Sequence, residues 1–86
     1  MDDIHEIASL LAGMESGETV ENFLREILTP SELKDIALRW ALMKRLANGH
    51  SQREIASELG ISLCKITRGA RILKDEKSVS RSVLVK

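Results

Sequence analysis

The stretch from Ser51 to Leu73 constrains the fold more than any other part of this 86-residue chain. Ser51 and Glu54 have the spacing of a capping box, in which each side chain binds the backbone N–H of the other residue and fixes a helix start. Gly60 supplies the positive φ that a tight break between two helices requires, and Ser62 is placed to cap a second helix. The segment therefore predicts two short helices joined by a tight turn, the pattern of a helix-turn-helix.

The second of these helices has one face for packing and one free face. Apolar side chains recur at Ile66, Ala70 and Leu73, which is the spacing of one inward face. The free face carries side chains that can contact thymine methyl groups, phosphates and purine edges in a major groove: Leu63, Cys64, Lys65, Thr67, Arg68 and Arg71. This face favours DNA as the partner. The alternative is an ordinary pair of packed helices, which would not need a basic outer face.

The net charge of zero conceals a division between the two halves of the chain. Residues 1–38 contain two basic and nine acidic side chains, a balance of −7, whereas residues 39–86 contain eleven basic and four acidic ones, a balance of +7. The basic half contains the predicted helix-turn-helix, so the asymmetry indicates a surface that binds a polyanion. The alternative is that these charges only decorate solvated helices.

The rest of the chain also predicts helices. Apolar spacing predicts a short helix over residues 4–11 and a second helix that begins near Thr19. Thr29, Pro30 and Glu32 then form the strongest helix start in the sequence, with Thr29 as the cap, and this third helix should run to Ala47. Residues 78–86 fit either a short docked turn of helix or a loose tail.

A chain of this size forms a marginal core, and its third helix is apolar around most of its circumference, so we expect a homodimer. The predicted fold is a single all-α domain. Residues 1–48 should form the dimerisation core, 49–74 the helix-turn-helix and 75–86 a short C-terminal segment.

Several classes of function lack a signal in the sequence. His5 and His50 are far apart and have no metal-ligand spacing, the lone Cys64 provides no zinc motif or internal disulfide, and no phosphate-binding loop is present. We therefore expect neither an enzyme nor a protein with a cofactor. No segment has the length of a membrane span and the N-terminus is acidic, which predicts a cytoplasmic protein.

The motifs resemble the Trp repressor family. The resemblance rests on L-T-P-S-E at 28–32, Arg39, S-Q-R-E at 51–54, E-L-G at 58–60 and I-T-R-G at 66–69, and covers over half the chain. It implies an intertwined helical dimer that binds operator DNA in response to L-tryptophan. It also implies DNA contacts from Gln52, Arg53, Leu63, Cys64, Lys65, Thr67, Arg68 and Lys74.

The resemblance further implies a ligand site. Arg39 and Arg68 match the two arginines that enclose the indole ring, a geometry that suits planar guanidinium groups, although a lone Arg39 can equally be a side chain that reaches solvent. The other implied ligand contacts are Gly69, the partner's backbone at positions matching Glu26, Leu28 and Thr29, and Ile72. At Ile72 the chain departs from the family, which has a serine there that binds the ligand's amino group.

This departure leaves three readings open. The protein is a tryptophan-gated repressor, a relative with a different effector or none, or a helical module whose basic half binds an acidic protein surface. Two further departures are a link one residue shorter before Ser51 and a shorter C-terminal segment, which bear on the orientation of the helix-turn-helix and on dimer contacts.

Overall fold

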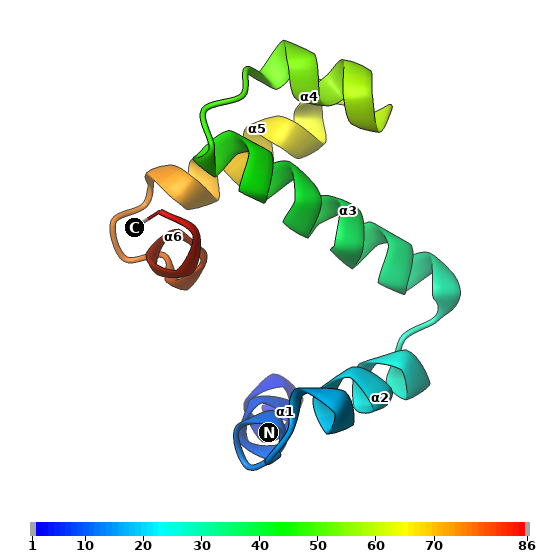
Figure 1. Ribbon diagram of the computed structural model, residues 1–86. Helices are drawn as coiled ribbons and strands as arrows, with labels where there is room; N and C mark the ends of the chain where they lie inside the picture. Colours follow the sequence, from blue (N-terminus) through cyan, green and yellow to red (C-terminus); the bar gives the residue numbers. More distant parts are fainter. Residues whose placement is uncertain (1, 86) are drawn as a thin grey trace. The chain divides into compact units, whose positions relative to one another are not determined.

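The computed structural model describes residues 2–85, which form six α-helices and no strand (Figure 1). The helices are α1 (Asp3–Ala12), α2 (Gly17–Ile27), α3 (Pro30–Ala47), α4 (Gln52–Leu59), α5 (Leu63–Lys74) and α6 (Val79–Leu84). The predicted all-α class is thus confirmed. The chain divides into two compact units, one up to Leu33 and one from Lys34 onward, with the boundary inside α3. None of the helices among residues 2–85 has both the length and the apolar character needed to cross a membrane.

Three helices begin at the predicted caps, Thr29, Ser51 and Ser62, and the start of α2 needs a correction. The Thr29 hydroxyl accepts a hydrogen bond from the Glu32 N–H at 3.1 Å, and the Glu32 carboxylate accepts one from the Thr29 N–H at 2.8 Å, so the predicted capping box opens α3. The prediction that the second helix begins near Thr19 is wrong, because Ser16 accepts from the Thr19 N–H and α2 begins at Gly17. The cap lies three residues earlier than expected, and Thr19 belongs to the first turn.

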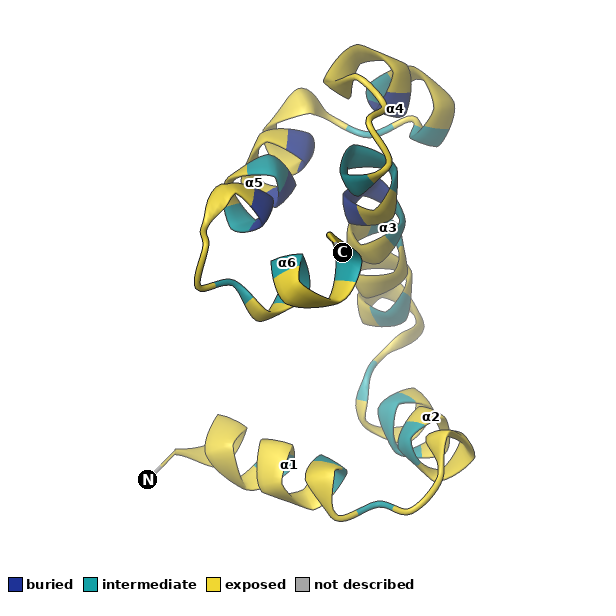
Figure 2. Ribbon diagram, turned by 60° about the vertical axis from the view of Figure 1, so that its left-hand side comes forward, coloured by how far each residue is buried: buried dark blue, intermediate teal, exposed yellow. Residues whose placement is uncertain are grey.

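The unit from Lys34 onward contains the buried core. Its buried side chains come from three helices: Leu42 and Met43 of α3, Ile55 of α4, and Ile66 and Leu73 of α5 (Figure 2).

The C-terminal residues form a helix and not a loose tail. α6 is attached to the end of α5 by the Arg81 guanidinium, which donates a hydrogen bond to the Leu73 carbonyl oxygen at 2.8 Å, and by Leu84, which packs against the core.

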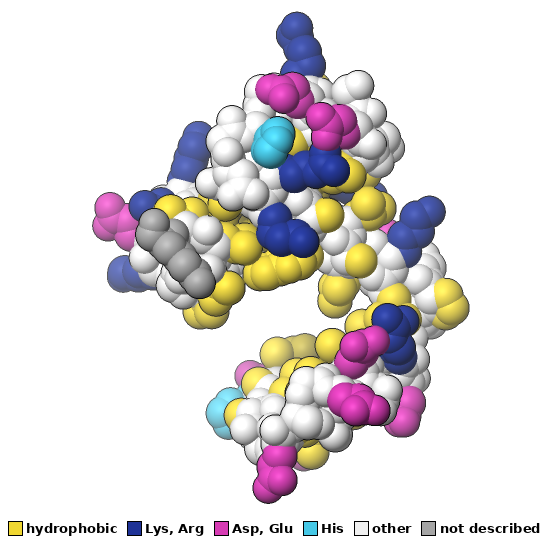
Figure 3. All heavy atoms as spheres, in the orientation of Figure 1, with side chains coloured by type: hydrophobic (Ala, Val, Ile, Leu, Met, Phe, Trp, Pro, Cys, Tyr) yellow, Lys and Arg dark blue, Asp and Glu magenta, His cyan; other side chains and the backbone are white. Residues whose placement is uncertain are grey.

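The unit up to Leu33 has a different character. Neither α1 nor α2 contains a buried residue, and large apolar side chains remain in contact with solvent, with Ile4 74% and Ile27 53% exposed. Figure 2 shows both helices only in the colours of exposed and half-buried residues, and Figure 3 shows hydrophobic side chains at their surface. Helices this short have little stability alone, so their apolar faces need a covering surface.

Candidate nucleic-acid interface

The segment from α4 to α5 is built as two capped helices around a glycine turn. The Ser51 hydroxyl accepts from the Glu54 N–H at 3.1 Å, and the Glu54 carboxylate accepts from the Ser51 N–H at 3.4 Å, which completes the predicted capping box. Gly60 ends α4 in the left-handed conformation with φ of 63°. Ser62 occupies the N-cap position of α5, but its hydroxyl oxygen does not accept the predicted hydrogen bond from a backbone N–H of the first turn. The turn therefore depends on Gly60 and on packing.

A close approach between α5 and α3 fixes the position of α5. Gly69 is buried, and a Cβ atom at this position would lie 2.5 Å from the Cδ1 atom of Leu42. Leu42 is only 1% exposed, so its side chain has little space to move away. Gly69, which the resemblance implies to lie beside a ligand, also lies against α3 side chains and permits the two helices to pack closely.

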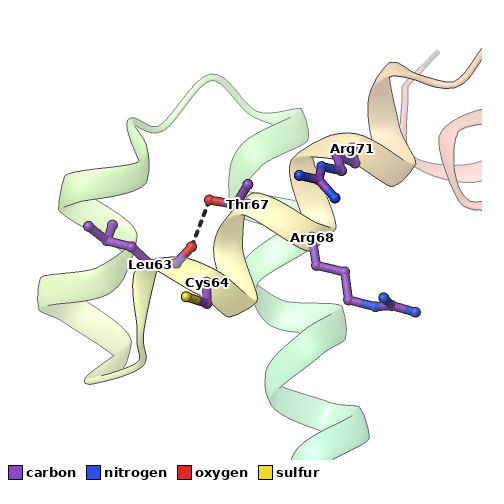
Figure 4. Close-up of a pocket in the computed structure, with 5 residues that line it drawn as sticks. All are labelled: Leu63, Cys64, Thr67, Arg68 and Arg71. Carbon is purple, nitrogen blue, oxygen red and sulfur yellow. Dashed lines mark hydrogen bonds between the residues drawn. The ribbon is translucent and has the colours of Figure 1, made fainter.

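The outward side of α5 forms an open groove of about 320 Å³, which we call the α5 groove (Figure 4). Its lining residues are Leu63, Cys64, Thr67, Arg68 and Arg71. The Thr67 hydroxyl donates to the Leu63 carbonyl oxygen at 2.9 Å, so its orientation is set by its own helix. Figure 4 shows both guanidinium groups projecting from α5. Cys64 is an exposed free thiol in this groove.

Arg71 is a site residue that the family resemblance did not supply. It was on the predicted free face, but it matches none of the DNA-contact positions that the resemblance implied. The signal for it is its spacing, since it follows Thr67 by four residues and therefore lies one turn further along the same face.

The cations of α5 are free of carboxylate partners. Within residues 2–85 the ion pairs are Arg25 with Glu21 and Arg45 with Glu58, and none involves α5. The helix contains no acidic residue and exposes four cations, Lys65, Arg68, Arg71 and Lys74. This arrangement leaves their donors available to an anion, as a surface that neutralises phosphates requires.

A second open groove, which we call the α4–α5 groove, has a volume of about 360 Å³. It brings together two predicted DNA contacts from different helices, Gln52 at the start of α4 and Lys74 at the end of α5. The remaining lining residues are Leu46, His50, Ser51, Ala70 and Leu73. Arg53, the other predicted contact on α4, is exposed but lines neither of these two grooves.

Arg39 and Arg68, the two arginines predicted to enclose the ligand, line different cavities. Arg39 lines a cleft of about 80 Å³ between α3 and α5 with Asp35 and Lys65, over a floor of Leu38, Leu42 and Ile61. Arg68 lines the α5 groove instead, and Ile72 is half-buried against the core. Leu28 and Thr29 belong to the unit up to Leu33.

Lys65, which was predicted as a DNA contact, thus also borders this α3–α5 cleft. The cleft offers a carboxylate, two cations and an apolar floor to a small ligand. No group of three or more potential metal-ligating side chains gathers among residues 2–85.

Comparisons with known proteins identify the chain's relatives. The sequence model of the family described as Trp repressor protein matches residues 2–86. A Trp operon repressor homolog of Xylella fastidiosa (strain M23) is 41% identical over 70 residues, which cover 80% of this chain and 76% of that protein. Homologs of the same name from Chlamydia trachomatis serovar D and Vibrio campbellii are 36% and 29% identical, covering 77% and 95% of this chain and 71% and 83% of their own lengths. No solved structure gives a significant match.

Proposed function

This chain belongs to the Trp repressor protein family, a family of regulators and not of enzymes, and we propose that it is a dimeric, ligand-gated transcriptional repressor that binds DNA in the cytoplasm. The observation that carries the proposal is the unpaired cationic face of α5, which lies directly after a capped helix and a glycine turn. An exposed face with four cations and no carboxylate is suited to the DNA backbone.

In this proposal α5 is the recognition helix. Helix-turn-helix proteins, of which Trp repressor is a standard example, place the first residues of this helix against base edges, and their dimers contact half-sites about 34 Å apart. Leu63, Cys64 and Thr67 near the start of α5 would then face the bases. Gln52, Arg53 and Lys65 would add to the sequence preference, and Arg68, Arg71 and Lys74 would neutralise phosphates.

The dimer is supported by the unit up to Leu33. Its apolar side chains are exposed in the single chain, including Ile4 and Ile27. Contiguous exposed apolar surface on a small domain indicates an interface, and a second copy of the chain provides a matching surface by symmetry.

Gating requires that a ligand bind the arrangement of α4 and α5 that fits DNA more tightly than the arrangement that does not fit DNA. The α3–α5 cleft contacts both the third helix and the recognition helix, so a ligand there would influence the position of α5. L-tryptophan is the candidate from the family; of the two arginines predicted to contact it, Arg39 lines this cleft and Arg68 lines the α5 groove. Ile72 provides no polar group for the ligand's amino group, which makes the ligand's identity the part of the proposal to test first.

A mobility-shift assay on genomic fragments at low salt, with and without L-tryptophan, tests the function. We expect a shift that strengthens with the ligand. A shift that is the same in both conditions would support a relative without this effector, and calorimetry with millimolar L-tryptophan would then show no heat of binding. The absence of any shift would contradict DNA binding and favour the protein-interaction module.

Arg71 tests the phosphate contacts separately. We expect Arg71→Ala to weaken binding on all DNA sequences alike and to reduce the slope of log K against log salt by about 0.9 per protomer, the value for one phosphate contact. Lys77→Ala removes the same charge from a position outside the α5 groove and is the matched control. An unchanged slope for Arg71→Ala would exclude it as a phosphate contact.

A further inference from the structure

We propose that the α4–α5 groove binds a DNA backbone phosphate through Lys74 and a protonated His50, so that DNA binding takes up a proton. The inference rests on the proposed DNA-binding function and adds a residue that neither the motifs nor the family resemblance identified. His50 lies in the link between α3 and α4, and Lys74 ends α5, so the two side chains come from opposite sides of the groove.

The groove provides the chemistry that a phosphate needs. Its lining combines apolar side chains with three exposed polar ones, His50, Gln52 and Lys74. A phosphate oxygen accepts hydrogen bonds from an ammonium group, an imidazolium and an amide. These three side chains are exposed, so a DNA strand that lies across the open groove would present a phosphate to them.

The hydrogen bonding of His50 determines which ring nitrogen faces an incoming anion. Its Nδ1 atom lies 3.1 Å from the carbonyl oxygen of Arg45, which also accepts from the His50 backbone N–H at 3.1 Å. A carbonyl oxygen only accepts, so Nδ1 must carry a hydrogen. In the neutral ring Nε2 then holds a lone pair. Nε2 can donate to a phosphate only after it gains a proton, and this requirement couples phosphate binding to proton uptake.

The charged groups around His50 are consistent with this coupling. Lys74 is the charged side chain that shares the groove. In the neighbouring helices, the Arg45 guanidinium of α3 pairs with Glu58 and the Glu54 carboxylate of α4 accepts from the Ser51 N–H. No carboxylate lines the groove, so an added phosphate would be the counter-ion for both cations.

The test is the pH dependence of DNA affinity at constant ionic strength between about pH 8 and 5.5, the range in which imidazole side chains change charge. We expect the affinity of the wild-type protein to rise about threefold per protomer as the pH falls, and so about tenfold for a dimer, the size of one exposed ionic contact on each copy. His50→Gln keeps the polar volume without the charge and should lose this rise. His5→Gln, in α1, is the matched control and should retain it.

A pH response in His50→Gln equal to that of the wild type would overturn the inference. NMR of the His50 ring supplies a direct reading: its titration midpoint should move to higher pH on addition of a DNA duplex, and an unmoved midpoint would also overturn it. Inorganic phosphate at the same ionic strength should leave the midpoint in place, whereas an equal movement would assign the groove to the free anion. Failure of the proposed function is distinguishable, because the wild-type protein would then bind no DNA at any pH.

Discussion

The two units of this chain use similar apolar content in opposite ways. The unit from Lys34 onward buries Leu42, Ile55 and Ile66 almost completely, because Gly60 turns the chain between α4 and α5 and Gly69 lets α5 approach α3 closely. The unit up to Leu33 buries no side chain completely within residues 2–33. The difference indicates that the unit from Lys34 onward supports its own core, whereas α1 and α2 together do not bury their apolar side chains.

The largest expected effect comes from the core of the unit from Lys34 onward. Ile66 is 0% exposed, so we expect Ile66→Ala to lower the free energy of unfolding by about 2–5 kcal/mol, through lost apolar burial and the cavity left behind. Leu63→Ala on the same helix removes a side chain that is 56% exposed and should change it by less than about 0.5 kcal/mol. Urea unfolding measures the free energy of unfolding of both variants. Equal decreases in the two variants would contradict the burial of Ile66 in the core.

The second prediction concerns the uncovered faces of the N-terminal unit. If a second copy covers α2, Ile27→Asp places a charge in the interface and should weaken dimerisation by about tenfold or more, since a buried unpaired charge is costly. Asn22→Asp makes the same change in charge at an exposed polar position of α2 and is the control. Sedimentation equilibrium measures both variants. A dimer as strong in Ile27→Asp as in the wild type would mean that α2 is not in the interface.

The third prediction tests the close helix crossing. Gly69→Ala should lower the free energy of unfolding by about 1–3 kcal/mol through overpacking against Leu42, less up to about 1 kcal/mol from the better helix propensity of alanine. A Cβ atom added at Gly17 would meet no other atom within 4 Å, so Gly17→Ala should be neutral or slightly stabilising. A stabilised Gly69→Ala protein would show that the α3–α5 contact adapts easily.

The sequence predicted those parts of the fold that depend on local chemistry. The capping boxes at Thr29 and Ser51 and the turn at Gly60 were predicted correctly, because each depends on residues within a few positions of one another. The start of α2 was not, because Ser16 and Thr19 are both plausible caps, and the choice depends on which N–H groups the following turn leaves free.

The site was less accessible to sequence reasoning. Gln52 and Lys74 line one groove although they lie on different helices, and His50, from the link before α4, lines it with them. The separation of Arg39 and Arg68 into two cavities depends on helix packing that no local pattern encodes. The roles of these residues in binding DNA or a ligand remain predictions.

The smallest expected effect is the pH response of the capping box at the start of α3. The Thr29 backbone N–H, and then its hydroxyl, hold the pKa of Glu32 below its ordinary value of 4.5. A carboxylate with a lowered pKa in the folded state contributes stability at higher pH and loses it as the pH falls through that lowered pKa. We therefore expect Glu32→Gln to reduce the urea midpoint slightly at pH 7 and to flatten its fall below about pH 4.5.

Glu32 is exposed, so its contribution to stability comes from capping and not from burial. The Glu32→Gln variant therefore tests the local stability of the start of α3, separately from any covering of α1 and α2 by a second copy. Glu15→Gln removes the same charge from the link between α1 and α2, where no hydrogen bond holds the carboxylate among the described residues, and should leave the acid response unchanged. Equal effects of the two variants would attribute the acid response to net charge. A larger effect of Glu32→Gln would attribute the acid response to the capping box. The start of α3 would then be stabilised locally, whether or not a second copy covers α1 and α2.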